Sequence, residues 1–108
     1  ENKKMFQVYI LNNLPKIQFE AALAHEFLHI WLFKKNITLD KPLMEGFCNL
    51  GSYLIYKLDD TKFSKILLLS LENTETNSDA YKYTILKKMM EKHNFKYILN
   101  NIQTIDIQ

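Results

Sequence analysis

The sequence of 108 residues contains one cysteine, two glycines and two prolines. Because Cys48 has no second cysteine to pair with, a disulfide within the chain is excluded, and the redox compartment stays open. The sequence also lacks an excess of either charge, since 14 basic and 12 acidic residues leave a net charge of +2. This balance gives no electrostatic reason to expect a nucleic acid as partner.

A long uninterrupted apolar run is missing as well. The most apolar stretch, residues 21–33, is broken by His25, Glu26 and His29, and therefore cannot be read as a membrane span. We interpret it as a helix inside a folded domain.

The composition is that of a folded protein, because 47% of the residues are hydrophobic and 13% are aromatic. Such a chain can bury one compact core, and we expect a single domain over residues 1–108. The chain opens at Glu1 without an initiator methionine or signal-like segment and reaches a strand-like run at once, which suggests the C-terminal part of a longer protein. The sequence indicates neither an oligomeric state nor a cellular location.

The predicted order of elements is one strand followed by helices. Residues 5–11 (MFQVYIL) are rich in β-branched and aromatic types and precede the breaker run at 12–15, so we expect an edge strand and a turn. The predicted class is mainly α, with any further strands upstream, and the first helix is long enough to be the central one. The five helices are expected at residues 17–35, 42–58, 62–71, 79–93 and 95–102.

The ends of these helices carry capping signals. Asp40 or Lys41 is expected to cap the second helix, with Pro42 in the first turn, where its missing N–H costs nothing. Thr61 is expected to cap the third helix. Asn94 tolerates the left-handed conformation and is expected to end the fourth helix.

Three polar residues stand out in the first helix, because every other residue between positions 21 and 33 is apolar. A helix that is apolar all round is normally buried, and a buried carboxylate such as Glu26 is costly unless it is paired or close to a metal. His25 and His29 lie one helical turn apart, so both imidazoles can bind one ion. Glu26 flanks that ion and can act as general base, which is the His-Glu-x-x-His arrangement of zinc peptidases.

The alternative is that the two histidines and Glu26 only satisfy one another's hydrogen bonds in the core, since a short motif also occurs by chance. Ala21 and Ala22, one turn before the motif, would leave the helix surface free of large side chains where a substrate approaches. As good helix formers they fit a simple packing contact equally well.

A catalytic zinc usually has three protein ligands and one open position, so a third ligand is needed. We expect Glu45, because the first helix continues about 9 Å beyond His29 and an antiparallel second helix then returns to the level of the histidines. Asp40 competes but suits helix capping better, and Glu45 also fits a first-turn acid favoured by the helix dipole. Gly46 favours the ligand role, because a glycine there suggests close approach of the first helix or the metal.

Two resemblances follow from these residues. The segment Met44–Phe47 (MEGF) resembles the Asn-Glu-Gly-Phe segment that supplies the glutamate ligand in gluzincin aminopeptidases. A closer resemblance, firm over residues 9–56 and fainter over 79–102, is to the DA-one-like peptidase domain of plant LIM-domain regulators of organ size and of bacterial proteins. The matching residues are Leu14-Pro15, Leu23-Ala24-His25-Glu26, His29 with Trp31-Leu32, and Glu45-Gly46 with Cys48.

The second resemblance implies a zincin-like helix pair and a zinc-dependent endopeptidase with one Zn²⁺. It implies His25, His29 and Glu45 as metal ligands and Glu26 as the catalytic glutamate. Met44 stands where family members often have a second acid, so Glu45 is the glutamate expected to bind. Neither a LIM domain nor a ubiquitin-interacting motif is present in this chain, and the substrate therefore stays open.

Tyr81 falls near a Tyr-Gly segment of the family, although Lys82 replaces the glycine here. In a zinc peptidase the tetrahedral oxyanion needs a donor besides the metal, and Tyr81 is our first candidate. Core packing or surface exposure is the alternative for this tyrosine.

The remaining residues of interest have simpler interpretations. Cys48, three residues after Glu45, is expected to be a small buried side chain, with approach to the metal as the alternative. His93 is expected to interact with the dipole at the end of the fourth helix. Trp31 and Phe33 are expected in the core. A solvated face is expected for the lysines at positions 82, 87, 88, 92 and 96.

Two functions are compatible with the sequence. The first is a zinc-dependent metallopeptidase that hydrolyses a peptide or protein substrate with Glu26 as general base. A strand at residues 5–11 would then bind extended substrate backbone by β-augmentation. The second is a non-catalytic zinc-binding or pseudopeptidase domain that acts as a protein-binding module.

Overall fold

The computed structural model describes residues 15–72 and 78–105, with the backbone alone for 78–80. The described residues form five helices, and each predicted helix is confirmed to within one residue at either end. The mainly α class is therefore confirmed, whereas the strand expected at residues 5–11 lies outside the described residues. No described helix is long and apolar enough to cross a membrane. The helices are α1 (Lys16–Lys34), α2 (Lys41–Asp59), α3 (Lys62–Glu72), α4 (Ser78–Lys92) and α5 (Phe95–Asn101).

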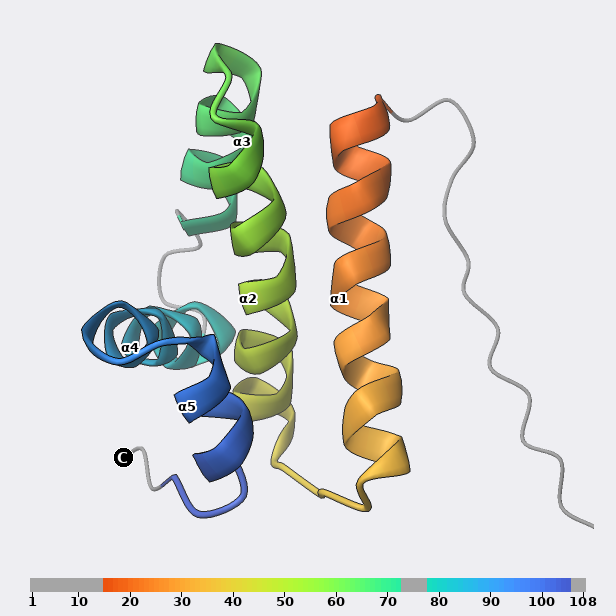
Figure 1. Ribbon diagram of the computed structural model, residues 1–108, viewed down its shortest axis with the longest axis vertical. Helices are drawn as coiled ribbons and strands as arrows, with labels where there is room; N and C mark the ends of the chain where they lie inside the picture. Colours follow the sequence, from red (N-terminus) through yellow and green to blue (C-terminus); the bar gives the residue numbers. More distant parts are fainter. Residues whose placement is uncertain (1–14, 73–77, 106–108) are drawn as a thin grey trace, which may run out of the picture.

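The central helix is α2, not α1. Figure 1 shows α1 running antiparallel beside one side of α2, while α3 and α4 pack on the other side. In this view α4 is seen nearly end-on, so it crosses α2 steeply, and α5 packs against α4. The prediction of a central first helix was wrong for the described residues, because an all-round apolar pattern does not tell which side is covered.

The exposure of α1 follows from this arrangement. Its only buried residues are Ala21 and Leu32, and the side of α1 turned away from α2 exposes Phe27 by 56%. Phe33 is 49% exposed, so its expected core position was wrong. Trp31 is half-buried and packs on Phe47 of α2, with the ring centroids 5.8 Å apart.

The core lies between α2, α4 and α5. Leu43, Phe47 and Leu50 recur on α2 at spacings of three and four, which places them on one face of the helix. That face meets Leu86 of α4 and Ile98 of α5, both fully buried. Burial of such side chains contributes about 1.5 to 3 kcal/mol each relative to full exposure, so this face of α2 anchors the fold.

The helix ends show which capping signals are used. The Thr61 side-chain oxygen accepts from the Ser64 backbone N–H at 3.1 Å, which confirms Thr61 as the cap of α3. Asp40 occupies the N-cap position of α2 but makes no capping hydrogen bond with its side chain. Asn94 is extended, with φ −178°, and accepts from the Tyr97 N–H at 2.7 Å. The left-handed end predicted at Asn94 was wrong, because in this short link the residue caps the start of α5.

A half-buried polar cluster joins α2, α3 and α4. The Tyr83 hydroxyl donates to Glu72 at 3.0 Å, Lys87 donates to the same carboxylate at 2.6 Å, and the Tyr53 hydroxyl donates to Glu91 at 3.1 Å. Burial, followed by the hydrogen bond to Glu91, raises the pKa of Tyr53 to about 12. The Lys87 side chain is only 22% exposed, so the solvated face expected for it was wrong.

Candidate metal centre

The candidate site lies in the seam between α1 and α2. A Cβ at Gly51 would lie only 2.9 Å from the Ala24 carbonyl oxygen, so the missing side chain allows the two backbones to approach. Beside it, the Ser52 hydroxyl donates to the Ala21 carbonyl at 2.9 Å. These contacts fix the antiparallel register of the seam and bring the first turns of α2 to the level of the histidines.

Three side chains converge in this seam. The Nε2 atoms of His25 and His29 lie 3.2 Å apart. The Glu45 carboxylate lies 3.2 Å from His25 Nε2 and 3.3 Å from His29 Nε2. The return of α2 to the histidines, which the sequence predicted for Glu45, therefore occurs, while the competing Asp40 is exposed at the helix start.

The converging side chains are partly open to solvent. The exposed fractions are 19% for His25, 26% for His29 and 24% for Glu45. Full burial of the motif, assumed from the apolar sequence around it, is not what the described residues show. A site of this kind is accessible to an ion and to a ligand without rearrangement of the helices.

Cys48 lies directly next to these residues and is fully buried, as its preferred interpretation predicted. Donor atoms of His25, His29 and Cys48 all lie within 4.8 Å of one another and form a group that could hold a metal ion. Burial, with the charges of Glu45 and Glu26 as smaller causes, raises the pKa of the Cys48 thiol well above its usual range. Glu45 contacts both imidazoles from the same helix.

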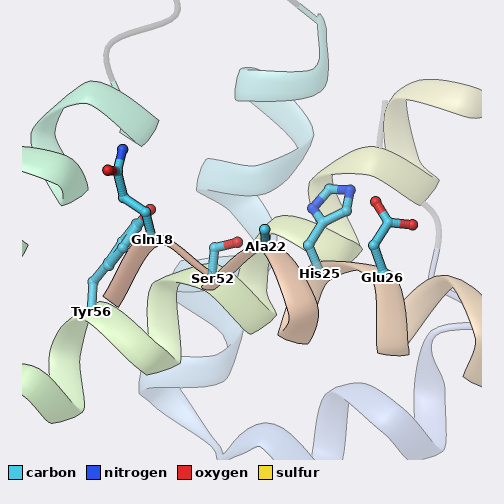
Figure 2. A pocket seen from close by; sticks show the side chains of 6 residues that line it. All are labelled: Gln18, Ala22, His25, Glu26, Ser52 and Tyr56. Atoms are coloured by element: carbon cyan, nitrogen blue, oxygen red, sulfur yellow. The ribbon is translucent and has the colours of Figure 1, made fainter. Parts of the chain in front are cut away.

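Glu26 faces an open pocket that continues from His25 along the seam. The pocket has a volume of about 330 Å³. Figure 2 shows the side chains of Glu26 and His25 at one end of this pocket and those of Gln18 and Tyr56 at the other. Ser52 and Ala22 lie between the two ends. Glu26 thus stands beside the candidate metal-binding group, at the mouth of a space large enough for a ligand.

The two alanines before the motif, Ala21 and Ala22, have different surroundings. Ala21 is buried, and its carbonyl accepts the hydrogen bond from Ser52, so the packing interpretation holds for it. Ala22 lines the pocket, which fits a surface kept thin for a substrate.

The pocket residues Gln18, Ser52 and Tyr56 were missed by the sequence interpretation. A helical signal for them exists, because Gln18 precedes Glu26 by eight residues, and Ser52 and Tyr56 follow Glu45 by seven and eleven. These spacings repeat the helix faces that carry Glu26 and Glu45, but they gain meaning only once the register between α1 and α2 is known.

Gly46 makes a different contact from the one predicted. A Cβ at Gly46 would lie 2.7 Å from the backbone nitrogen of Tyr83, so the close approach is by α4 and not by α1. The prediction was wrong because a glycine signals contact without naming the neighbour. The close contact between α1 and α2 belongs to Gly51 instead.

Tyr81 lies on α4, two residues before Tyr83. It is 52% exposed and does not line the pocket at Glu26. The contact of α4 with Gly46 nevertheless brings this part of α4 close to the α2 turn that carries Glu45. A role for Tyr81 at the oxyanion stays a prediction. His93 stacks on Tyr97, with ring centroids 3.9 Å apart.

Comparison with known families now adds to this geometry. The family model named DA1-like and described as Protein DA1 matches residues 1–108. The chain belongs to the DA1-like family. The DA-one-like resemblance noted from the motif residues is thereby confirmed, and for this DA1-like chain it extends over all 108 residues. No curated protein and no solved structure matches the chain.

Proposed function

We propose that this DA1-like domain is a zinc-dependent metallopeptidase, in which His25, His29 and Glu45 bind one Zn²⁺ and Glu26 is the general base. The observation that carries the proposal is the convergence of two imidazole nitrogens and one carboxylate at 3.2 to 3.3 Å from one another. One member of this group, His25, lines one end of a pocket that Glu26 also lines.

The spacing of the donors fits zinc. Ligands at about 2.0 to 2.1 Å from a tetrahedral zinc ion stand about 3.3 to 3.4 Å from one another. The distance of 3.2 Å between the two imidazole nitrogens agrees with this value to within about 0.2 Å, and each nitrogen lies 3.2 to 3.3 Å from one Glu45 oxygen, Oε1 for His25 and Oε2 for His29. Two imidazoles and one carboxylate are also the ligand set of well-known zinc peptidases, with a fourth position left open.

The described side chains divide the roles that the reaction requires. Zinc bound in this group would lower the pKa of a water molecule to about 7 and polarise the substrate carbonyl. Glu26 accepts the proton of the attacking water and then donates it to the nitrogen of the leaving amine. The pocket beyond His25 offers space for part of the substrate.

A second candidate, a non-catalytic zinc-binding module for proteins, is favoured by one observation. Cys48 lies within 4.8 Å of the histidine donors, so His25, His29, Glu45 and Cys48 together offer four protein donors. Closed sets of four donors are typical of structural zinc sites. Cys48 is fully buried, whereas His25, His29 and Glu45 are each partly open to solvent, which favours three ligands and an open position.

Glu26→Gln separates the two functions when zinc content and cleavage of a peptide library are both measured. We expect Glu26→Gln to keep one zinc per chain and to lose cleavage by about 10²- to 10⁴-fold, the usual contribution of a general base. The control is Glu20→Gln, which removes a carboxylate of the same helix that is 44% exposed and paired with Lys16 at 3.9 Å. It should leave both zinc content and cleavage unchanged.

The outcomes contradict the proposal in two ways. Zinc bound by the wild type without cleavage of any peptide would overturn the peptidase and favour the binding module. Absence of zinc at saturating metal would overturn both functions.

A further inference from the structure

The pocket beside the candidate metal centre, called here the seam pocket, is lined by Gln18, Ala22, His25, Glu26, Ser52 and Tyr56. On α1 its floor extends from Glu26 back to Gln18, which is about 12 Å along the helix axis. With a volume of about 330 Å³ it lies at the lower limit of ligand pockets. The seam pocket therefore has room for one side chain of a substrate and not for a long segment.

The far end of the seam pocket is polar and uncharged. Gln18 offers an amide donor and a carbonyl acceptor, and Tyr56 offers a hydroxyl that both donates and accepts. Burial raises the pKa of Tyr56 above its usual value, which keeps the hydroxyl protonated. Ser52 already donates to the Ala21 carbonyl, so its oxygen is left as an acceptor.

The described residues at the far end of the seam pocket carry no charge, and Glu26 and the proposed zinc ion both lie at the other end. Glu26 is its single carboxylate, and none of the six lining residues is a lysine. An acidic side chain that reaches the far end would lose water there without gaining a cation, because the proposed zinc ion lies at the opposite end of the pocket. An aliphatic side chain would displace water from Gln18 and Tyr56 and leave their polar groups without partners.

We infer that the seam pocket receives the substrate side chain next to the scissile bond and selects an uncharged, hydrogen-bonding residue such as glutamine, asparagine or tyrosine. Acidic residues at the same substrate position are rejected. The inference rests on the peptidase function proposed above, and it assigns Gln18 and Tyr56 as the residues that determine specificity.

The test compares cleavage of peptides that differ only at the residues flanking the scissile bond. For the wild type, kcat/KM should be about tenfold or more higher for glutamine than for glutamate at one of these positions, which corresponds to about 1.4 kcal/mol. Gln18→Lys places a cation at the far end of the pocket and should reverse this order. Tyr56→Phe should reduce the preference for glutamine over leucine by about two- to tenfold, the value of one neutral hydrogen bond.

A matched control adds the same charge elsewhere. Asn100→Lys changes an exposed residue of α5, which lies across α2 from α1 (Figure 1), and should leave the wild-type preference intact. Zinc content and thermal unfolding of each variant establish that the fold and the metal site are retained. A second measurement, the inhibition of the wild type by zinc-binding peptide hydroxamates with glutamine or glutamate side chains, should show the same order.

The outcomes distinguish this inference from the proposed function. Cleavage with equal rates for glutamine and glutamate at both flanking positions would overturn the inference and leave the peptidase standing. The same holds if Gln18→Lys leaves the order unchanged, or if Asn100→Lys reverses it as well. Absence of cleavage of every peptide would overturn the peptidase, and the inference with it.

Discussion

Gly51→Ala tests whether the seam sets the geometry of the metal donors. The added Cβ would lie 2.9 Å from the Ala24 carbonyl oxygen, 3.1 Å from its carbon and 3.2 Å from the Leu28 side chain. The first two atoms are backbone of α1, so they cannot rotate away. Because ordinary contacts of this kind are 3.4 Å or longer, α1 must move away from α2 by about 0.5 Å, as the van der Waals limit requires.

Two effects act on stability. Overpacking costs about 1 to 3 kcal/mol, while replacing glycine by alanine inside a helix returns about 0.5 to 1 kcal/mol. The net loss is therefore about 0 to 2.5 kcal/mol. Zinc affinity is more sensitive to this shift than stability is. Ala24 directly precedes His25, so a movement of the α1 backbone at Ala24 also moves His25. A shift of about 0.5 Å exceeds the tolerance of about 0.2 Å for metal–ligand distances. We expect zinc affinity to fall by about 10- to 100-fold, as for other changes that misplace metal ligands.

The matched control is Gly46→Ala in the same helix. Its Cβ would lie 2.7 Å from the Tyr83 nitrogen, so it pushes α2 and α4 apart and adds no close contact with α1. Zinc affinity is measured by competition with a chromophoric chelator, and stability of the metal-free chain by urea unfolding. Unchanged zinc affinity in Gly51→Ala would refute the reasoning, as would an equal loss of affinity in Gly46→Ala at equal stability.

Two further predictions concern Cys48 and Tyr53. Cys48→Ser should leave zinc affinity unchanged within about threefold, whereas a metal-bound thiolate would make the loss much larger. With Co²⁺ in place of zinc, the wild type should show no sulfur-to-cobalt charge-transfer absorption, and a strong band would make Cys48 a ligand. The folded pKa of Tyr53, raised by burial to about 12, lies above that of the unfolded chain near 10, so its contribution to stability is present below pH 10 and lost as the pH rises through 12. Tyr53→Phe should flatten the fall of the urea midpoint between these pH values, and an unchanged slope would contradict this assignment.

The helices could be predicted from the sequence because their signals are local. Pro15 precedes α1, Pro42 stands in the first turn of α2, and Thr61 caps α3 with its own side chain. The neighbours of each helix could not be predicted in the same way. Gly46 indicated a close contact, but its partner Tyr83 lies 37 residues further along the chain. Tertiary packing alone decides which residue such a glycine contacts.

In the candidate site, too, one part follows from local sequence signals and another part depends on tertiary packing. His25 and His29 lie one turn apart on one helix, so their convergence follows from helix geometry alone. Glu45 required one further assumption, an antiparallel second helix after a short turn, and the distances of 3.2 and 3.3 Å bear it out. The seam pocket required the register of that helix pair, which depends on Gly51 and Ser52. Nothing in the sequence alone identifies Gly51 or Ser52 as a contact between the two helices.

The small residues of the seam link the fold to the candidate chemistry. Gly51 allows the α1 backbone to approach, and Ser52 uses its hydroxyl to hold Ala21 while its oxygen faces the seam pocket. A larger side chain at either position would separate the helices, and the same separation would spread the metal donors and widen the pocket. The outer side of α1 is largely exposed in the described residues, so nothing there opposes such a shift. The seam must therefore supply both the packing that holds α1 and the distances that a metal site requires.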